Sequence, residues 1–226
     1  MYICKNNNKD GVKYLIDNGA SINYENKNGI TPLMFVCEND EDDLVKLLID
    51  MGANINQKNK DGITPLMYAC DNGHESIIDI LLVNGAEINE ENSHGKTPLM
   101  YACRNSNNDL IDYLIKKGAY INTTNRNGIT PLMYACDIGK LEVVKYLVDK
   151  GANMNMKDTK GNTPLMMACM NESKEIVDYL LKKGANVIQK NGIGQTALLI
   201  AKNKNNNSLI KILIDYGADI HIHFFY

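Results

Sequence analysis

The chain has 226 residues, of which 44% are apolar and 23% charged, and its formal net charge is −3. This balance excludes a disordered chain, a collagen-like chain and a strongly basic nucleic-acid-binding protein. No apolar run approaches the roughly 18 residues of a membrane span, and the N-terminal segment MYICKNNNKDG lacks the apolar core of a secretion signal. We therefore expect no membrane insertion and a location in the cytoplasm or the nucleus. Asn, Lys and Ile are frequent, which we attribute to the base composition of the genome rather than to chemistry.

A seven-residue segment recurs along the chain at a spacing of 33 residues. It reads TPLMFVC from Thr31, TPLMYAC from Thr64, Thr97 and Thr130, TPLMMAC from Thr163, and TALLIAK from Thr196. A Gly-Ala pair recurs in step with it, from Gly19 to Gly217. Two sequence markers that recur at the same spacing, with no inserted residues between copies, indicate a repeat protein. We predict one domain, residues 1–226, of about seven repeats: 1–25 (partial), 26–58, 59–91, 92–124, 125–157, 158–190 and 191–226.

Each repeat is predicted to contain two short helices and a projecting hairpin loop. In one copy, Thr64 has the hydroxyl of a good N-cap, and Pro65 suits the first helical position. The apolar spacing within 77–82 predicts the second helix, and Gly85 is typical of a left-handed helix end. Asp61-Gly62 and its counterparts predict the turn of the loop. Because two short helices cannot bury their apolar faces alone, we expect the repeats to stack on one another.

The cysteines follow the same period and occupy equivalent places, at Cys4, Cys37, Cys70, Cys103, Cys136 and Cys169. Helices in stacked repeats pack roughly 8–10 Å apart, whereas a disulfide needs Cα atoms within about 7 Å. We therefore expect reduced, buried thiols. A redox or metal role is the alternative, and no CxxC or Cys/His spacing favours it.

The 33-residue period with its TPL-x-x-A core resembles the ankyrin repeat, and the resemblance covers essentially the whole chain. It implies an all-α solenoid of stacked helix-turn-helix units with projecting β-hairpin loops. It also implies a non-enzymatic scaffold whose concave face, formed by loops and first helices, binds another protein or peptide. The fourth letter of the family signature is usually a His that ties adjacent repeats by hydrogen bonds. Here that position holds Met34, Met67, Met100, Met133, Met166 and Leu199, so we expect apolar packing to supply the tie.

Positions that vary between the copies indicate where a partner binds. The candidate basic residues are Lys58, Lys60, Arg104, Arg126, Lys157, Lys160 and Lys190. The candidate aromatic residues, at equivalent first-helix positions, are Phe35, Tyr68, Tyr101 and Tyr134. The variable positions are more basic than the chain as a whole, most strongly toward the C-terminal half, which favours an acidic partner. Tyrosine is common in binding hot spots, but packing against the next repeat explains the same rings, and both interpretations stay open.

Other sites find little support in the sequence. The histidines His74, His94, His221 and His223 fall at unrelated repeat positions, so they indicate no nucleophile–base pair. We interpret the alternating His221 and His223 as a C-terminal tail rather than a metal site. The acidic run 38–43 lacks the Gly and closing Glu of a calcium loop, so we interpret it as a helix cap and solvated loop. We expect no metal, no cofactor, no nucleic-acid partner and a monomer.

One alternative function stays open. The segment at Met1 aligns with the middle of a first helix and lacks the Thr-Pro cap of the other copies. This favours a regulatory or targeting segment of a larger protein, such as a channel, a kinase or a ubiquitin-ligase adaptor.

Overall fold

The computed structural model describes residues 8–105 and 107–219, and its contacts divide the chain into two units, residues 1–120 and 121–226. Within the described residues the regular secondary structure is helical, without a strand. The N-terminal unit contains α1 (Lys9–Asp17), α2 (Pro32–Glu38), α3 (Asp42–Asp50), α4 (Pro65–Asn72), α5 (Glu75–Val83), α6 (Pro98–Ala102), the 3-10 turn η2 (Cys103–Asn105) and α7 (Asn108–Lys116). The C-terminal unit contains α8 (Pro131–Asp137), α9 (Leu141–Asp149), α10 (Pro164–Met170), α11 (Lys174–Lys182), α12 (Ala197–Asn203) and α13 (Asn207–Asp215).

The threonine of each repeat starts the first helix as predicted. The hydroxyl of Thr64 accepts a hydrogen bond from the Met67 backbone N–H at 3.3 Å, and Pro65 follows at the first helical position. Four other copies form the same cap, at 3.1–3.4 Å. The exception is Thr97, whose buried hydroxyl has no partner in the described part of the chain. Capping satisfies one of the N–H groups that a helix start leaves without an intrahelical partner.

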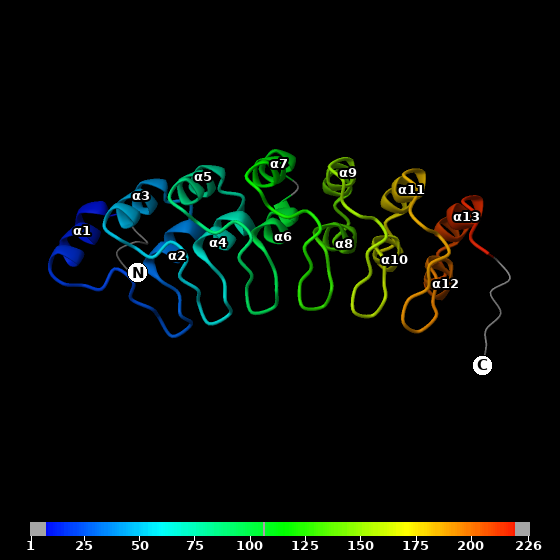
Figure 1. The fold of residues 1–226 in the computed structure, drawn as a ribbon, viewed down its shortest axis with the longest axis horizontal. Helices are drawn as coiled ribbons and strands as arrows, with labels where there is room; N and C mark the ends of the chain where they lie inside the picture. The colour runs from blue at the N-terminus through cyan, green and yellow to red at the C-terminus, as the bar shows by residue number, and fades with distance from the viewer. Residues whose placement is uncertain (1–7, 106, 220–226) are drawn as a thin grey trace. The chain divides into compact units, whose positions relative to one another are not determined.

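The helices of each unit form two rows. In the N-terminal unit, α4 packs between α2 and α6, and α5 packs against α3 in the second row (Figure 1). In the C-terminal unit, α10 packs between α8 and α12, and α11 packs between α9 and α13. The residues that face the neighbouring repeat are small or apolar and fully buried, as Leu66, Ala69 and Cys70 show. Stacking therefore buries the faces that one repeat alone leaves exposed.

The five described cysteines are free and buried, which confirms the expectation of reduced thiols for Cys37, Cys70, Cys103, Cys136 and Cys169. Burial raises the pKa of the Cys103 and Cys169 thiols to about 12, because the thiolate would lose its solvation. The predictions for Met1, Cys4, His221 and His223 concern residues outside those that the structure describes. The prediction that residues 1–226 form one domain of about seven repeats stays a prediction.

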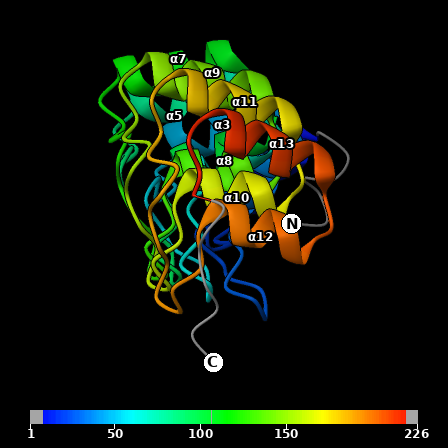
Figure 2. The ribbon, with the colours of Figure 1, turned by 90° about the vertical axis from the view of Figure 1, so that its right-hand side faces the viewer.

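The loops project from the first-helix side of each unit. Figure 1 shows them below α4 and α6 in the N-terminal unit, and below α10 and α12 in the C-terminal unit. In the orthogonal view, the loops before α10 and α12 again project together from one side of their helices (Figure 2). We use the name connecting loops for residues 21–30, 54–63 and 87–96 of the N-terminal unit and residues 121–129, 154–162 and 187–195 of the C-terminal unit. None of the helices described is long and apolar enough to cross a bilayer.

Candidate partner-binding surface

One asparagine inside each connecting loop fixes the shape of that loop. The Oδ1 atom of Asn59 accepts hydrogen bonds from the backbone N–H groups of Asp61 and Ile63, both at 2.9 Å. The same pair of bonds recurs at the equivalent side chains, which are Asn26, Asn92, Asn125, Asp158 and Asn191. Because the side chain holds two successive N–H groups, the loop backbone is ordered before any partner arrives.

Neighbouring connecting loops are also joined by their backbones. In the N-terminal unit the N–H of Ser93 donates to the Asp61 carbonyl at 2.9 Å. In the C-terminal unit the N–H of Thr159 donates to the Asn127 carbonyl at 2.9 Å, and the N–H of Gly192 donates to the Lys160 carbonyl at 2.7 Å. The loops of each unit therefore form one bonded row.

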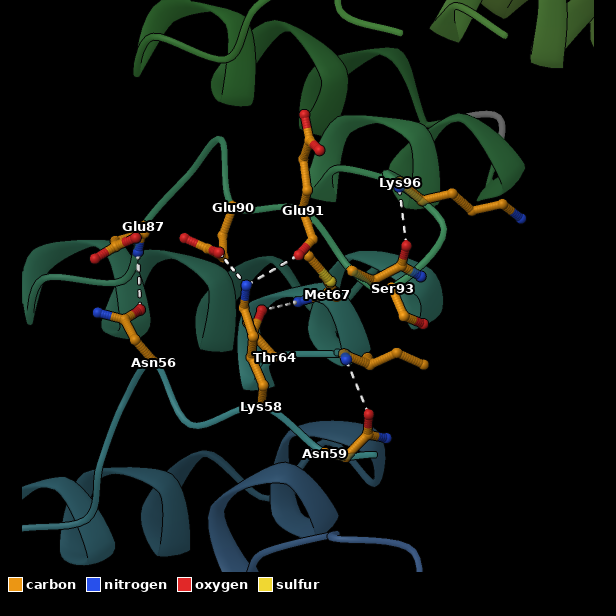
Figure 3. Close-up of polar contacts among 12 residues, drawn as sticks. Asn56, Lys58, Asn59, Thr64, Met67, Glu87, Glu90, Glu91, Ser93 and Lys96 are labelled. Carbon is orange, nitrogen blue, oxygen red and sulfur yellow. Dashed lines mark hydrogen bonds and ion pairs between the residues drawn. The ribbon is translucent and has the colours of Figure 1, made fainter. Parts of the chain in front are cut away.

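A second set of asparagines ties each repeat to the next. The Oδ1 atom of Asn56 accepts a hydrogen bond from the Glu87 N–H at 3.0 Å (Figure 3). Its Nδ2 donates to the Gly85 carbonyl at 3.0 Å. Asn89 makes the equivalent pair with Tyr120 and Gly118. The acceptor half of this pattern recurs at Asn23, Asn122 and Asn155.

The predicted aromatic residues lie half-buried on the first helices. The hydroxyl of Tyr68 accepts a hydrogen bond from Asn59 Nδ2 at 3.0 Å, and that of Tyr101 accepts from Asn92 Nδ2 at 2.8 Å. Burial raises the pKa of Tyr68, so its hydroxyl stays protonated. Phe35 and Tyr134 are likewise half-buried, in the N-terminal and C-terminal unit respectively. Each of these rings thus packs into its repeat and keeps an exposed part.

Two of the three candidate basic residues in the N-terminal unit are paired with carboxylates. The ammonium of Lys58 forms an ion pair with Glu90 and donates to the Glu91 carbonyl at 3.1 Å (Figure 3). The guanidinium of Arg104 contacts the Asp71 carboxylate at 2.7 Å. Lys60 is exposed, and no carboxylate pairs with it in the described part of the chain.

The candidate basic residues of the C-terminal unit have a different environment. Arg126, Lys157, Lys160 and Lys190 are exposed, and no carboxylate among the described residues lies within pairing distance of them. The ammonium of Lys157 donates instead to the Lys190 backbone carbonyl at 3.0 Å. The one carboxylate in these three loops belongs to Asp158, which is only 9% exposed. The Asp158 carboxylate oxygens accept hydrogen bonds from within their own loop and form no ion pair with the exposed cations.

The family follows from a comparison with models of known families. The model described as "Ankyrin repeats (3 copies)" matches residues 1–92, 42–125, 81–158, 99–191 and 151–223, which together include most of the chain. The chain belongs to the ankyrin repeat family. Among solved structures, the crystal structure of the human ASB11 ankyrin repeat domain is similar, with 26% identity and a TM-score of 0.85. That match covers 96% of this chain and 97% of that one. A search of curated proteins returned no match.

The family assignment confirms the predicted fold and gives its function in general terms. Ankyrin repeats are protein–protein interaction modules, and their fold is typically a non-enzymatic binding scaffold. The helix pairs and projecting loops of each unit are those that the 33-residue pattern predicts.

The expectation for the ankyrin signature position needs a correction. The methionines there are buried as expected, and Met34 Sδ also accepts a hydrogen bond from the Thr31 N–H at 3.5 Å. However, the tie between repeats is not left to apolar packing, because Asn56 and Asn89 bond across to the next repeat. A polar link between repeats is therefore present at another position.

Sequence reasoning also missed the roles of the asparagines. The attribution of their abundance to base composition is wrong for the loop and inter-repeat sets, because those side chains make specific hydrogen bonds. The signal was readable in the sequence: Asn26, Asn59, Asn92 and Asn125 recur at the 33-residue period, as do Asn23 and Asn56.

The acidic run 38–43 lies beside a surface depression of about 510 Å³ that also includes His74 and Glu75. Asp42 and Asp43 belong to the first turn of α3, where negative charge favours a helix start. His74 Nδ1 lies 3.2 Å from an Asp40 carboxylate oxygen. In the described ranges no group of three or more His, Cys, Asp or Glu side chains is placed to hold a metal ion.

Proposed function

We propose that this protein is a non-enzymatic scaffold that binds another protein or peptide through its connecting loops and first helices. The observation that supports this most is that the buried positions of each repeat are nearly constant, whereas the exposed loop positions vary. Thr, Leu, Met, Ala and Cys of the recurring segment are buried, whereas the exposed side chains of hydrogen-bonded loops differ between copies. Within each unit, hydrogen-bonded loops whose exposed side chains vary between repeats suit selection of one partner, because little entropy is lost when ordered loops bind.

The proposed contact residues are the aromatic and basic side chains that the sequence indicates, and we expect them to contribute unequally to the affinity. Tyr68 keeps its O–H hydrogen available, because its oxygen accepts from Asn59 and no acceptor for it lies among the described residues. It combines a half-exposed ring with a hydrogen-bond donor, which is the profile of a hot-spot residue. Lys58 and Arg104 contribute less, because binding an acidic group there competes with Glu90 and Asp71.

Affinity capture tests the proposal with two matched triple variants. The test variant is Tyr68→Ala, Tyr101→Ala and Tyr134→Ala, on the first helices. The control is Tyr113→Ala, Tyr146→Ala and Tyr179→Ala, three tyrosines on the second helices α7, α9 and α11. With both variants shown to be folded by circular dichroism, we expect partners of the wild type to be lost only from the test variant. Equal retention by both variants would contradict a first-helix binding surface.

We further propose that the protein acts as a monomer in a reducing compartment, the cytoplasm or the nucleus. Five buried free thiols are compatible with such a compartment. The alternative is an ankyrin segment that regulates or targets a larger protein. The match of this chain to a structure described as an ankyrin repeat domain supports this alternative. A gene sequence that continues beyond either end of these 226 residues would establish that alternative.

A further inference from the structure

The connecting loops of the two units differ in charge. The three loops of the N-terminal unit carry four cations and five carboxylates, a formal net charge of −1. The three loops of the C-terminal unit carry four cations and one carboxylate, a formal net charge of +3. The basic character expected of the binding positions is therefore unevenly distributed between the units.

Contacts inside the N-terminal unit reduce its basic character further. Lys58 lies between Glu90 and the Glu91 carbonyl, so its charge is already compensated within the row of loops. In the loop that carries Glu90, the proximity of the Glu90 carboxylate raises the pKa of Glu87. An acidic segment approaching here would meet carboxylates that already repel one another.

Contacts inside the C-terminal unit preserve its positive charge. Asp158 is buried and accepts hydrogen bonds from within its own loop, so it forms no ion pair with the four exposed cations. Backbone bonds join the three loops at Thr159 and Gly192. The Lys157 ammonium reaches across to the next loop at the Lys190 carbonyl. Four uncompensated cations thus lie on one bonded row.

We propose that the connecting loops of the C-terminal unit, through Arg126, Lys157, Lys160 and Lys190, form a binding site for an acidic peptide segment of the partner. The loops of the N-terminal unit do not take part in that recognition. This inference rests on the proposed scaffold function and assigns its preference for acidic partners to one place. Exposed cations on ordered loops steer an acidic partner and fix its register, so the association rate depends strongly on salt.

A peptide fits this surface better than a nucleic acid. Proteins that bind single strands combine a basic groove with aromatic side chains on which bases stack. The three connecting loops of the C-terminal unit contain no Phe, Tyr or Trp. Their cations are also few compared with the dense basic stripe of a nucleic-acid-binding face.

The test uses a fluorescein-labelled deca-glutamate peptide as the probe, at low ionic strength, with the whole chain. The test variant is Lys157→Glu, Lys160→Glu and Lys190→Glu. The control is Lys13→Glu, Lys27→Glu and Lys46→Glu, which makes the same change in net charge at exposed positions of the N-terminal unit. We expect the test variant to bind the probe at least tenfold more weakly, and the control to stay within about threefold of wild type. Raising the salt should weaken the wild type more than the test variant.

Three results would overturn the inference. Equal losses in the two variants would show that the probe responds to the net charge of the protein rather than to a site. A deca-thymidine probe that binds more tightly than the peptide and is lost in the same variant would assign the site to nucleic acid. Failure of the peptide to bind the wild type would remove the acidic site but leave the scaffold function intact, because affinity capture with the tyrosine variants judges that function separately.

Discussion

Asn59 offers a direct test of the idea that loop asparagines order the binding surface. Its side chain is 8% exposed and makes three hydrogen bonds, two from backbone N–H groups and one to the Tyr68 hydroxyl. A hydrogen bond contributes about 0.5–1.5 kcal/mol net, and groups left unpaired when buried cost more, so we expect Asn59→Ala to lower the free energy of unfolding by about 2–4 kcal/mol.

The aspartate found at the equivalent position of another repeat refines this magnitude. Asp158 accepts the same two backbone N–H groups at 2.9 and 2.7 Å. Asn59→Asp should therefore keep both loop bonds and cost less than half as much as Asn59→Ala. A double-mutant cycle with Tyr68→Phe should give a coupling energy of about 0.5–1.5 kcal/mol for the Nδ2–hydroxyl bond.

Urea unfolding followed by circular dichroism measures these differences, provided the m-value stays constant between variants. The control is Asn203→Ala, because the side chain of Asn203 is exposed and makes no hydrogen bond within the described part of the chain. We expect that change to fall within about 0.5 kcal/mol of wild type. A cost for Asn59→Ala no larger than that of the control would show that Asn59 does not hold its loop in place.

Three further predictions concern loop packing, thiol reactivity and alkaline pH. Gly62→Ala should destabilise the protein more than Gly52→Ala in thermal unfolding, although both glycines have a left-handed φ. A Cβ added at Gly62 would lie 2.6 Å from the Ser93 nitrogen, whereas a Cβ added at Gly52 would meet no atom within 4 Å. Equal losses would show that the loops separate readily. Brief iodoacetamide treatment should leave the buried thiols of the native protein unmodified, because burial raises the pKa of each. Mass spectrometry should find these thiols modified only in urea, at Cys37, Cys70, Cys103, Cys136 and Cys169. Modification in the native protein would contradict their burial. Burial and the Asp79 carboxylate raise the pKa of Tyr113 to about 12, so the folded state holds this proton more tightly than the unfolded state. Its contribution to stability is complete below pH 10 and is lost as the pH rises toward 12, so Tyr113→Phe should flatten the alkaline fall in stability, and an unchanged profile would count against it.

The sequence predicted the framework well because the framework depends on a few strongly constrained residues. Thr64, Pro65 and Gly85 each have one dominant local role, and their 33-residue spacing gives the length of the repeat without further information. The burial of Leu66, Ala69 and Cys70 follows from the same period, because every internal copy meets an identical neighbour.

The candidate site was harder to predict, because its chemistry depends on contacts between repeats. Lys58 and Lys157 occupy equivalent positions 99 residues apart, yet Lys58 pairs with Glu90 whereas Lys157 meets a backbone carbonyl. Which side chain lies opposite each lysine depends on how adjacent loops align, and a count of charges along the chain does not contain that information. The burial of Asp158 likewise follows from its repeat position, which it shares with the buried Asn59 and Asn92, rather than from its residue type.

Hydrogen exchange of the protein with and without a captured partner shows whether the connecting loops and first helices form the binding surface. We predict slower exchange on binding at the connecting loops and at the start of the first helices, including residues 154–162 and 187–195. We predict unchanged exchange in the second helices α9, α11 and α13. Slower exchange confined to those second helices would place the partner on the opposite side of the repeats and contradict this prediction.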